Sequence, residues 1–164
     1  MTYRHRWRSR DRVAHSSVAQ VVTSPPPAAA RTPAPPAGWR GSDRVTAPLR
    51  PALAALGRLD RLGRSTGPVL RRGGLAAFLL APGAAEPVPD LLGWLGWVPE
   101  LRLPIDAVAA HPGEPRVPEP RTADWLRAGA ERPALDLRSP DLLCLLDALA
   151  DACARERLGL PPAR

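Results

Sequence analysis

The chain has 164 residues, enough for one domain with a modest core, and its 23 basic residues, all arginine, face 16 acidic ones for a net charge of +7. It contains no lysine or asparagine and one residue each of isoleucine, phenylalanine, tyrosine and methionine, which indicates a G+C-rich coding sequence, so the arginine excess alone does not predict nucleic-acid binding. No run of 18 apolar residues and no signal-type N-terminal segment is present. We therefore expect a soluble cytoplasmic protein with no membrane partner.

The position of the charge is more informative than its total. Residues 1–50 contain nine arginines and two acidic residues, whereas residues 51–164 contain 14 of each. Codon bias acts evenly along a chain, so this asymmetry needs an explanation of its own. We predict a disordered arm rich in arginine and proline over residues 1–44, followed by a neutral domain over residues 45–160.

The first part of the arm places arginine at every second position. An extended segment of this kind can contact successive phosphates of DNA or RNA without reading their sequence, and an aromatic ring within it can stack on an exposed base. The alternatives are a solvated tail, a start codon assigned too far upstream, and contact of the arm with a protein partner or an anionic membrane surface. The predicted nucleic-acid-binding residues are Arg4, Arg6, Arg8, Arg10, Arg12 and Trp7.

The second part of the arm, residues 24–38, is rich in proline and alanine. Proline removes a backbone donor and fixes the φ angle, so this segment favours an extended polyproline-like linker over a helix or a strand. Such a linker can also dock on a protein partner.

The first elements of the domain are a helix and a hairpin. Leucines at three- and four-residue spacing over 49–62, followed by Gly63, predict an amphipathic helix. Two short apolar runs, residues 68–72 and 75–81, flank Gly73 and Gly74, which is typical of a β-hairpin.

The next segments are less regular. Residues 87–97 have leucines on one helical face and carry Trp94 and Trp97, although two internal glycines weaken the helix. Residues 101–107 alternate apolar and polar side chains around a proline, which predicts an edge strand. The proline-rich residues 110–122 predict a loop, and Trp125 with Leu126 predicts an anchor in the core.

The last helix has the clearest boundaries. Ser139, Pro140 and Asp141 give an N-cap, a first-turn proline and an early acid, and Gly159 ends a helix over residues 140–158. Ala148 falls on its polar side. The order helix, hairpin, helix, strand, helix predicts an α+β domain, in which a small antiparallel sheet of hairpin and edge strand packs with three helices.

The stretch from residue 56 to 97 resembles an uncharacterised family of high-G+C bacterial proteins, itself similar to the N-terminal domain of bifunctional DNA primase/polymerases. The resemblance is in a helix followed by Thr66–Val69, a hairpin, Ala81–Ala84, and a leucine-rich helix that ends in Trp97; the helix 140–158 is similar to the family's last one. It covers roughly residues 42–158. These motifs are apolar and turn residues, so the resemblance implies a fold ancestry and no particular chemistry.

The sequence departs from that family where catalysis would occur. A primase/polymerase needs closely spaced carboxylates on a core strand to hold two divalent metals. The strand implied before the first helix, residues 42–48, has Asp43 alone, followed by Arg44, and residues 111–120 replace a glycine-rich loop. The resemblance thus implies that the catalytic carboxylates have been lost.

Other candidate chemistry is weak. His111 and Glu114 lack further metal ligands, residues 63–67 lack the spacing and the lysine of a phosphate loop, and Cys144 beside acids is a poor nucleophile. We predict no catalytic residue, no metal site and no cofactor, and we lean against an enzyme.

Two functions remain open. The first is a non-catalytic, primase/polymerase-like accessory protein with weak, non-specific nucleic-acid contact through its arm. The alternative is a protein-interaction module that uses the proline-rich linker or the Trp94/Trp97 helix.

Overall fold

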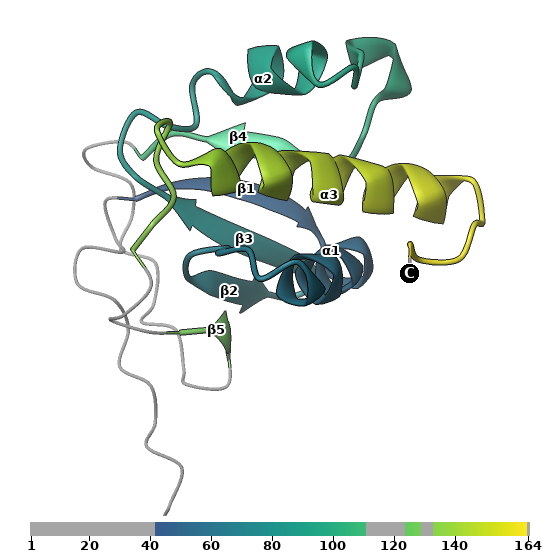
Figure 1. Cartoon of the computed structure of the whole chain (residues 1–164), viewed down its shortest axis with the longest axis horizontal. Coiled ribbons are helices and arrows are strands. Elements are labelled where there is room, and N and C mark those ends of the chain that lie inside the picture. The colour runs from purple at the N-terminus through teal and green to yellow at the C-terminus, as the bar shows by residue number, and fades with distance from the viewer. Residues whose placement is uncertain (1–41, 111–123, 129–132, 164) are drawn as a thin grey trace, which may run out of the picture. The chain divides into compact units, whose positions relative to one another are not determined.

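The computed structural model describes residues 42–110, 124–128 and 133–163 (Figure 1). The predicted α+β class is confirmed, since an antiparallel sheet packs with three α-helices. In chain order the elements are β1 (Asp43–Pro48), α1 (Leu49–Arg61), β2 (Val69–Arg72), β3 (Leu75–Leu80), α2 (Val88–Trp94), the 3-10 helix η2 (Pro99–Leu101), β4 (Asp106–Val108), β5 (Trp125–Arg127) and α3 (Pro140–Arg157).

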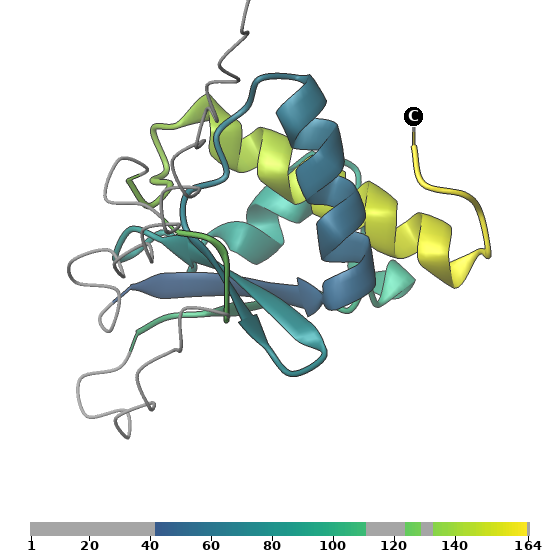
Figure 2. The same cartoon turned by 90° about the horizontal axis from the view of Figure 1, so that it is seen from below.

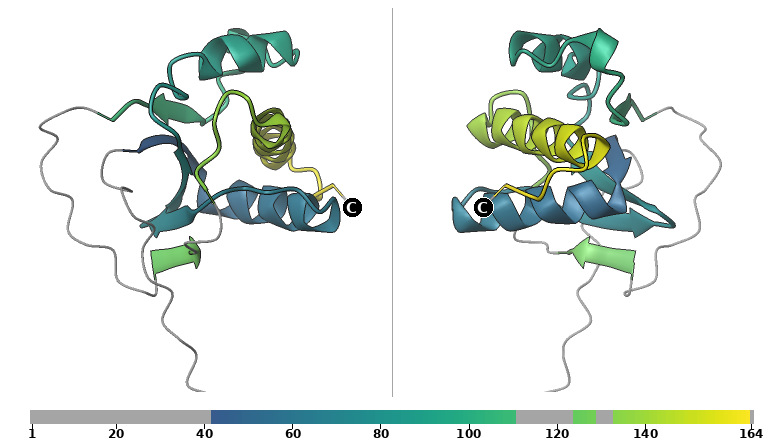
Figure 3. Two further views of the ribbon diagram at one scale, coloured as in Figure 1. Left: turned by 60° about the vertical axis from the view of Figure 1, so that its left-hand side comes forward. Right: turned by 90° about the vertical axis from the view of Figure 1, so that its right-hand side faces the viewer.

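The sheet has the strand order β4-β1-β3-β2-β5, and every pair of neighbouring strands is antiparallel. The longest pairing joins β1 to β3, with Val45 opposite Phe78 and Ala47 opposite Ala76. All three α-helices cover the same face of the sheet (Figures 2 and 3). Because side chains alternate between the two faces of a strand, every second residue of β1 and β3 points into the helical layer.

The main core lies between this face and the helices. Val45, Phe78 and Leu80 from the sheet are fully buried there. They pack with the leucines of one face of α3, which are Leu142, Leu145, Leu146 and Leu149. A second, smaller cluster forms on the opposite face of the sheet from Leu70, Ala77, Leu79 and Trp125. Trp125 is therefore an anchor, as predicted, but it anchors the face away from the helices.

Helix α3 begins as the sequence predicts and is buried over a wider arc. The Ser139 hydroxyl accepts a hydrogen bond from the Asp141 N–H at 3.3 Å, and Pro140 occupies the first turn. Ala148, predicted on the polar side, is buried. The prediction was wrong because α1 packs against that side of α3, so both the leucine face and the alanine face are covered.

The β2–β3 hairpin is also confirmed. Gly73 lies at the turn with φ of 58°, a left-handed conformation that favours glycine, and the Gly74 carbonyl accepts a hydrogen bond from the Leu49 N–H at 2.8 Å. This bond joins the hairpin turn to the start of α1.

The edge strand was predicted in the wrong place. Residues 99–101 instead form η2, Arg102 takes a left-handed conformation with φ of 43°, and the strand β4 begins only at Asp106. Pro99 favours the 3-10 turn, and Pro104 has no N–H to donate to a neighbouring strand. For these two reasons the pairing with β1 begins only at Asp106. β4 does lie at the edge of the sheet.

Two strands were not identified from periodicity. β1 begins at Asp43, two residues before the predicted domain start at residue 45, and β5 has only three residues. β1 mixes charged, polar and apolar residues, and β5 is too short, so neither shows a clear alternation of apolar and polar side chains.

Both cysteines are free thiols, and Cys153 is buried in the core, whereas Cys144 is half-buried. Burial, and secondly the nearby charge of Glu156, raises the pKa of the Cys153 thiol from 9.0 to about 11. The chain has no lysine, so few other groups titrate in this range.

We expect the domain to lose stability between pH 9 and pH 11. The unfolded chain releases the Cys153 proton near its ordinary pKa of 9.0 while the folded chain retains it to about 11. Stability is therefore intact below pH 9 and falls by up to about 3 kcal/mol as the pH rises to 11. Urea unfolding followed by circular dichroism at a series of pH values measures this loss. Cys153→Ala should abolish the loss and Cys144→Ala should keep it; an equal loss in both variants would contradict the assignment to Cys153.

Candidate functional site

The residues predicted to bind nucleic acid, Arg4, Arg6, Arg8, Arg10, Arg12 and Trp7, lie outside the described residues. So do the proline-rich linker 24–38 and the weak metal candidates His111 and Glu114. Among the predicted positions, the structure describes Asp43, the loop 63–67 and the two tryptophans of the α2 segment.

Asp43 stands where the resemblance implies a metal-binding strand, and its carboxylate is already engaged. The side chain is buried at the start of β1, 3% exposed. One oxygen accepts a hydrogen bond from the Ala85 N–H and the other from the Ala110 N–H, both at 2.9 Å. The carboxylate thus ties the segment before α2 and the segment after β4 to β1. These contacts give Asp43 a structural role.

The loop 63–67 is engaged with the start of α3. The Ser65 N–H donates to one oxygen of Asp141 at 3.1 Å, and a terminal guanidinium nitrogen of Arg64 lies 3.5 Å from the other. A carboxylate therefore occupies the place near this amide that a phosphate would need. Gly67, with φ of 62°, lets the chain pass close to the carbonyl of Pro133.

The two tryptophans near α2 differ in environment. Trp97 is half-buried, and its indole N–H donates to Asp147 of α3 at 3.3 Å. Trp94 is 75% exposed, next to exposed Val98 and Leu101 along the chain. Trp97 fixes the α2 segment to α3, whereas Trp94 leaves a large apolar surface in solvent.

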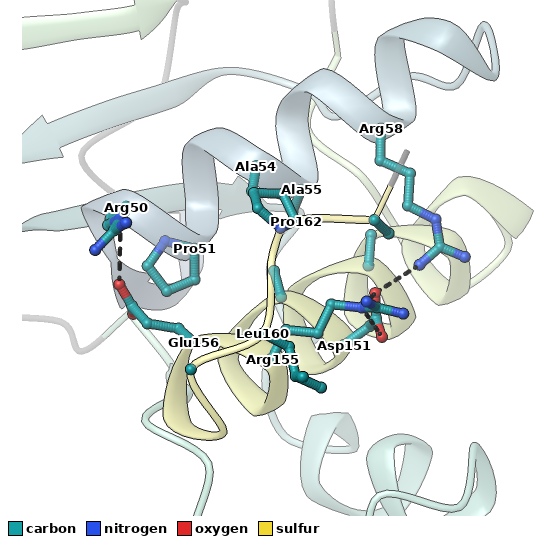
Figure 4. A pocket seen from close by; sticks show the side chains of 14 residues that line it. Arg50, Pro51, Ala54, Ala55, Arg58, Asp151, Arg155, Glu156, Leu160 and Pro162 are labelled. Atoms are coloured by element: carbon teal, nitrogen blue, oxygen red, sulfur yellow. Dashed lines mark hydrogen bonds and ion pairs between the residues drawn. The ribbon is translucent and has the colours of Figure 1, made fainter.

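A pocket of about 160 Å³ lies between α1, α3 and residues 159–163, which follow α3 (Figure 4). Small and apolar side chains form its middle, among them Pro51, Ala54, Ala148, Leu160 and Pro162. The space exists because alanines, not leucines, face each other across this part of the helix pair.

Charged side chains stand at the two ends of the pocket (Figure 4). At one end an Arg50 nitrogen lies 3.8 Å from a Glu156 oxygen, and the Arg50 side chain is 91% exposed. At the other end Arg58 and Arg155 both approach Asp151, at 3.4 and 2.9 Å. Arg58 also lies 3.5 Å from Asp147. The lining thus holds three cations and two anions.

Sequence reasoning missed this pocket. The only local signal in the sequence is the pair Asp151 and Arg155, which lie four residues apart on one helix, a spacing at which opposite charges can interact. The partners from α1 and the segment after α3 are distant in sequence, and no local pattern predicts that they meet.

The sequence matches no protein-family model, no curated protein and no solved structure. Within residues 42–110, 124–128 and 133–163, no group of three or more histidine, cysteine, aspartate or glutamate side chains is arranged to hold a metal ion. No helix in the same ranges has the length and apolar character needed to cross a bilayer.

We expect Asp43→Ala to lower the free energy of unfolding by about 3 kcal/mol, because one buried and one partly buried backbone N–H group lose a charged acceptor. Urea unfolding measures the change. Asp136→Ala is the matched control, since within the described residues the Asp136 carboxylate accepts one hydrogen bond, from Arg138 N–H, at an exposed site; its cost should be below about 1 kcal/mol. Equal costs for the two variants would contradict the structural role of Asp43.

Proposed function

We propose that this chain is a non-catalytic accessory protein that contacts nucleic acid weakly, without sequence preference, through its N-terminal arm. The observation that carries the proposal is the distribution of charge: the +7 of the chain falls within residues 1–50, and residues 51–164 are neutral. Five arginines between residues 4 and 12 could each meet one phosphate of DNA or RNA.

The ion pairs of the folded domain support the assignment of nucleic-acid contact to the arm and not to the domain. Arg58, Arg64 and Arg155 each lie within 3.5 Å of a carboxylate of α3. Arg127 pairs in the same way with Asp60. Several arginines of the domain are therefore balanced by neighbours that reduce their attraction for phosphate, whereas the arm has one acid, Asp11, among its first five arginines.

We also propose that the domain descends from a primase/polymerase-like fold and has lost its catalytic site. The order of helix, hairpin and Trp-bearing helix supports the ancestry, and the engaged carboxylate of Asp43 supports the loss. The free thiols Cys144 and Cys153 support a reducing, cytoplasmic location.

If the arm is the segment that binds nucleic acid, its arginines should set the salt dependence of the affinity. For the full chain and an arbitrary labelled duplex, fluorescence anisotropy should give a slope of log K against log salt of about −4, because five arginines release counterions. Arg8→Gln with Arg10→Gln should reduce the slope by about 2. The matched control replaces two exposed arginines of the β2–β3 hairpin, Arg71→Gln with Arg72→Gln, and should leave the slope unchanged. Equal effects of the two pairs would refute the arm as the binding segment.

A protein-interaction module is the second candidate, and the exposure of Trp94 favours it. Residues 86–101 contain three acids and no arginine in a chain that is strongly basic. The same segment exposes Trp94 and Val98, by 75% and 47%. The acids of this segment disfavour phosphate binding there, whereas an exposed aromatic anchor suits an apolar patch of a partner protein. The proline-rich linker 24–38 would be a second contact in this function.

The two tryptophans should respond differently to substitution. Trp94→Ala should change the free energy of unfolding by less than about 0.5 kcal/mol, because the side chain is exposed. Trp97→Phe should cost about 1 kcal/mol, because Asp147 loses the indole N–H. A partner that docks on this surface should be retained at high salt by the wild-type chain and lost with Trp94→Ala. It should also be retained by Leu53→Ala, a control at an exposed leucine of α1. Equal retention by both variants would exclude docking at Trp94.

A further inference from the structure

The pocket between α1, α3 and residues 159–163 has the dimensions of a small-molecule site. Its volume is about 160 Å³, close to that of engineered cavities of roughly 150 Å³ that accept benzene. The segment after α3 is held over it by three hydrogen bonds: Leu160 N–H donates to the Arg155 carbonyl, Arg155 to the Pro161 carbonyl and Arg61 to the Ala163 carbonyl. The space can thus hold one ring or a short branched chain.

At the end of the pocket formed by Arg58, Asp151 and Arg155, the guanidinium group of Arg155 has an N–H donor that is not used within the described residues. Arg155 contacts Asp151 only through Nε, at 2.9 and 3.0 Å, and its Nη1 lies 3.4 Å from the Pro161 carbonyl. Its Nη2 makes no hydrogen bond within the described part of the chain. Asp151 also serves Arg58, so one carboxylate is shared by two guanidinium groups. A second carboxylate would complete the pairing of Arg155.

We propose that this pocket binds a small organic monocarboxylate whose apolar body is a single ring or a short branched chain. The carboxylate pairs with the Nη atoms of Arg155, and the apolar body lies among Pro51, Ala54, Leu160 and Pro162. The excess of arginine over acidic residues in the lining disfavours a cation, and the apolar middle disfavours a fully polar anion such as inorganic phosphate. The residues that form the site are not those on which either function proposed above rests, so this proposal does not depend on them.

Benzoate is a suitable probe, and benzyl alcohol is its neutral counterpart. With the full chain labelled with ¹⁵N, we expect benzoate to shift the backbone amide signals of Ala54 and Ala152 with a Kd of about 1 mM, as for a ligand of this size. Benzyl alcohol should bind at least about tenfold more weakly, because it lacks the charge that Arg155 recognises.

Two pairs of variants locate the binding. Arg155→Gln should weaken benzoate binding about tenfold, whereas Arg157→Gln, an exposed arginine of α3 outside the lining, should not change it. Ala54→Leu should fill the pocket and abolish binding, whereas Ala154→Leu, outside the lining, should retain it. The amide spectrum of each variant reports whether it is folded.

The remaining outcomes overturn the proposal. Absence of benzoate binding at a concentration tenfold above the expected Kd would exclude the site. Binding that survives Ala54→Leu would place benzoate elsewhere, for example on the arginines of the arm. Equal affinity for benzyl alcohol would exclude recognition of the carboxylate. None of these results bears on nucleic-acid binding, which the salt titration tests separately.

Discussion

The contacts of α3 hold together most of the described domain. Its leucine face packs on the sheet, and its alanine face packs on α1. Its four acidic residues each join the helix to another segment. Asp141 engages the loop 63–67, Asp147 engages Trp97 and Arg58, Asp151 engages Arg58, and Glu156 engages Arg50. Apolar burial supplies the stabilisation, whereas the partly exposed ion pairs contribute at most about 1 kcal/mol each and chiefly fix the positions of the segments.

The same helix explains why the pocket exists. Where α3 meets the sheet, leucines fill the space between two layers. Where it meets α1, alanines such as Ala55 and Ala148 allow the two backbones to approach. The two helices cross (Figure 2), so they separate away from the crossing, where short side chains cannot fill the gap. The segment after α3 covers the gap from outside, and arginines remain at its ends because their charged heads stay near solvent.

The parts of this fold that could be predicted are those with local causes. The start of α3 follows from Ser139 and Pro140, and the hairpin follows from Gly73 and Gly74, because a cap or a turn is decided by neighbouring residues. β5 has only three residues and depends on pairing with β2, which is distant in sequence, so no local pattern marks it. For the candidate site, the pair of Asp151 and Arg155 was predictable from helical spacing, whereas its meeting with Arg58 was not.

Asp43 shows how a residue can suggest one role by its position in sequence and have another in the structure. A lone carboxylate on a strand before the first helix resembles the remnant of a metal site. Its two oxygens instead accept hydrogen bonds from the N–H groups of Ala85, before α2, and Ala110, after β4. A buried carboxylate needs compensation, and two backbone amides supply it here. The same two hydrogen bonds join the segments before α2 and after β4 to the start of β1, so one side chain holds three parts of the fold together.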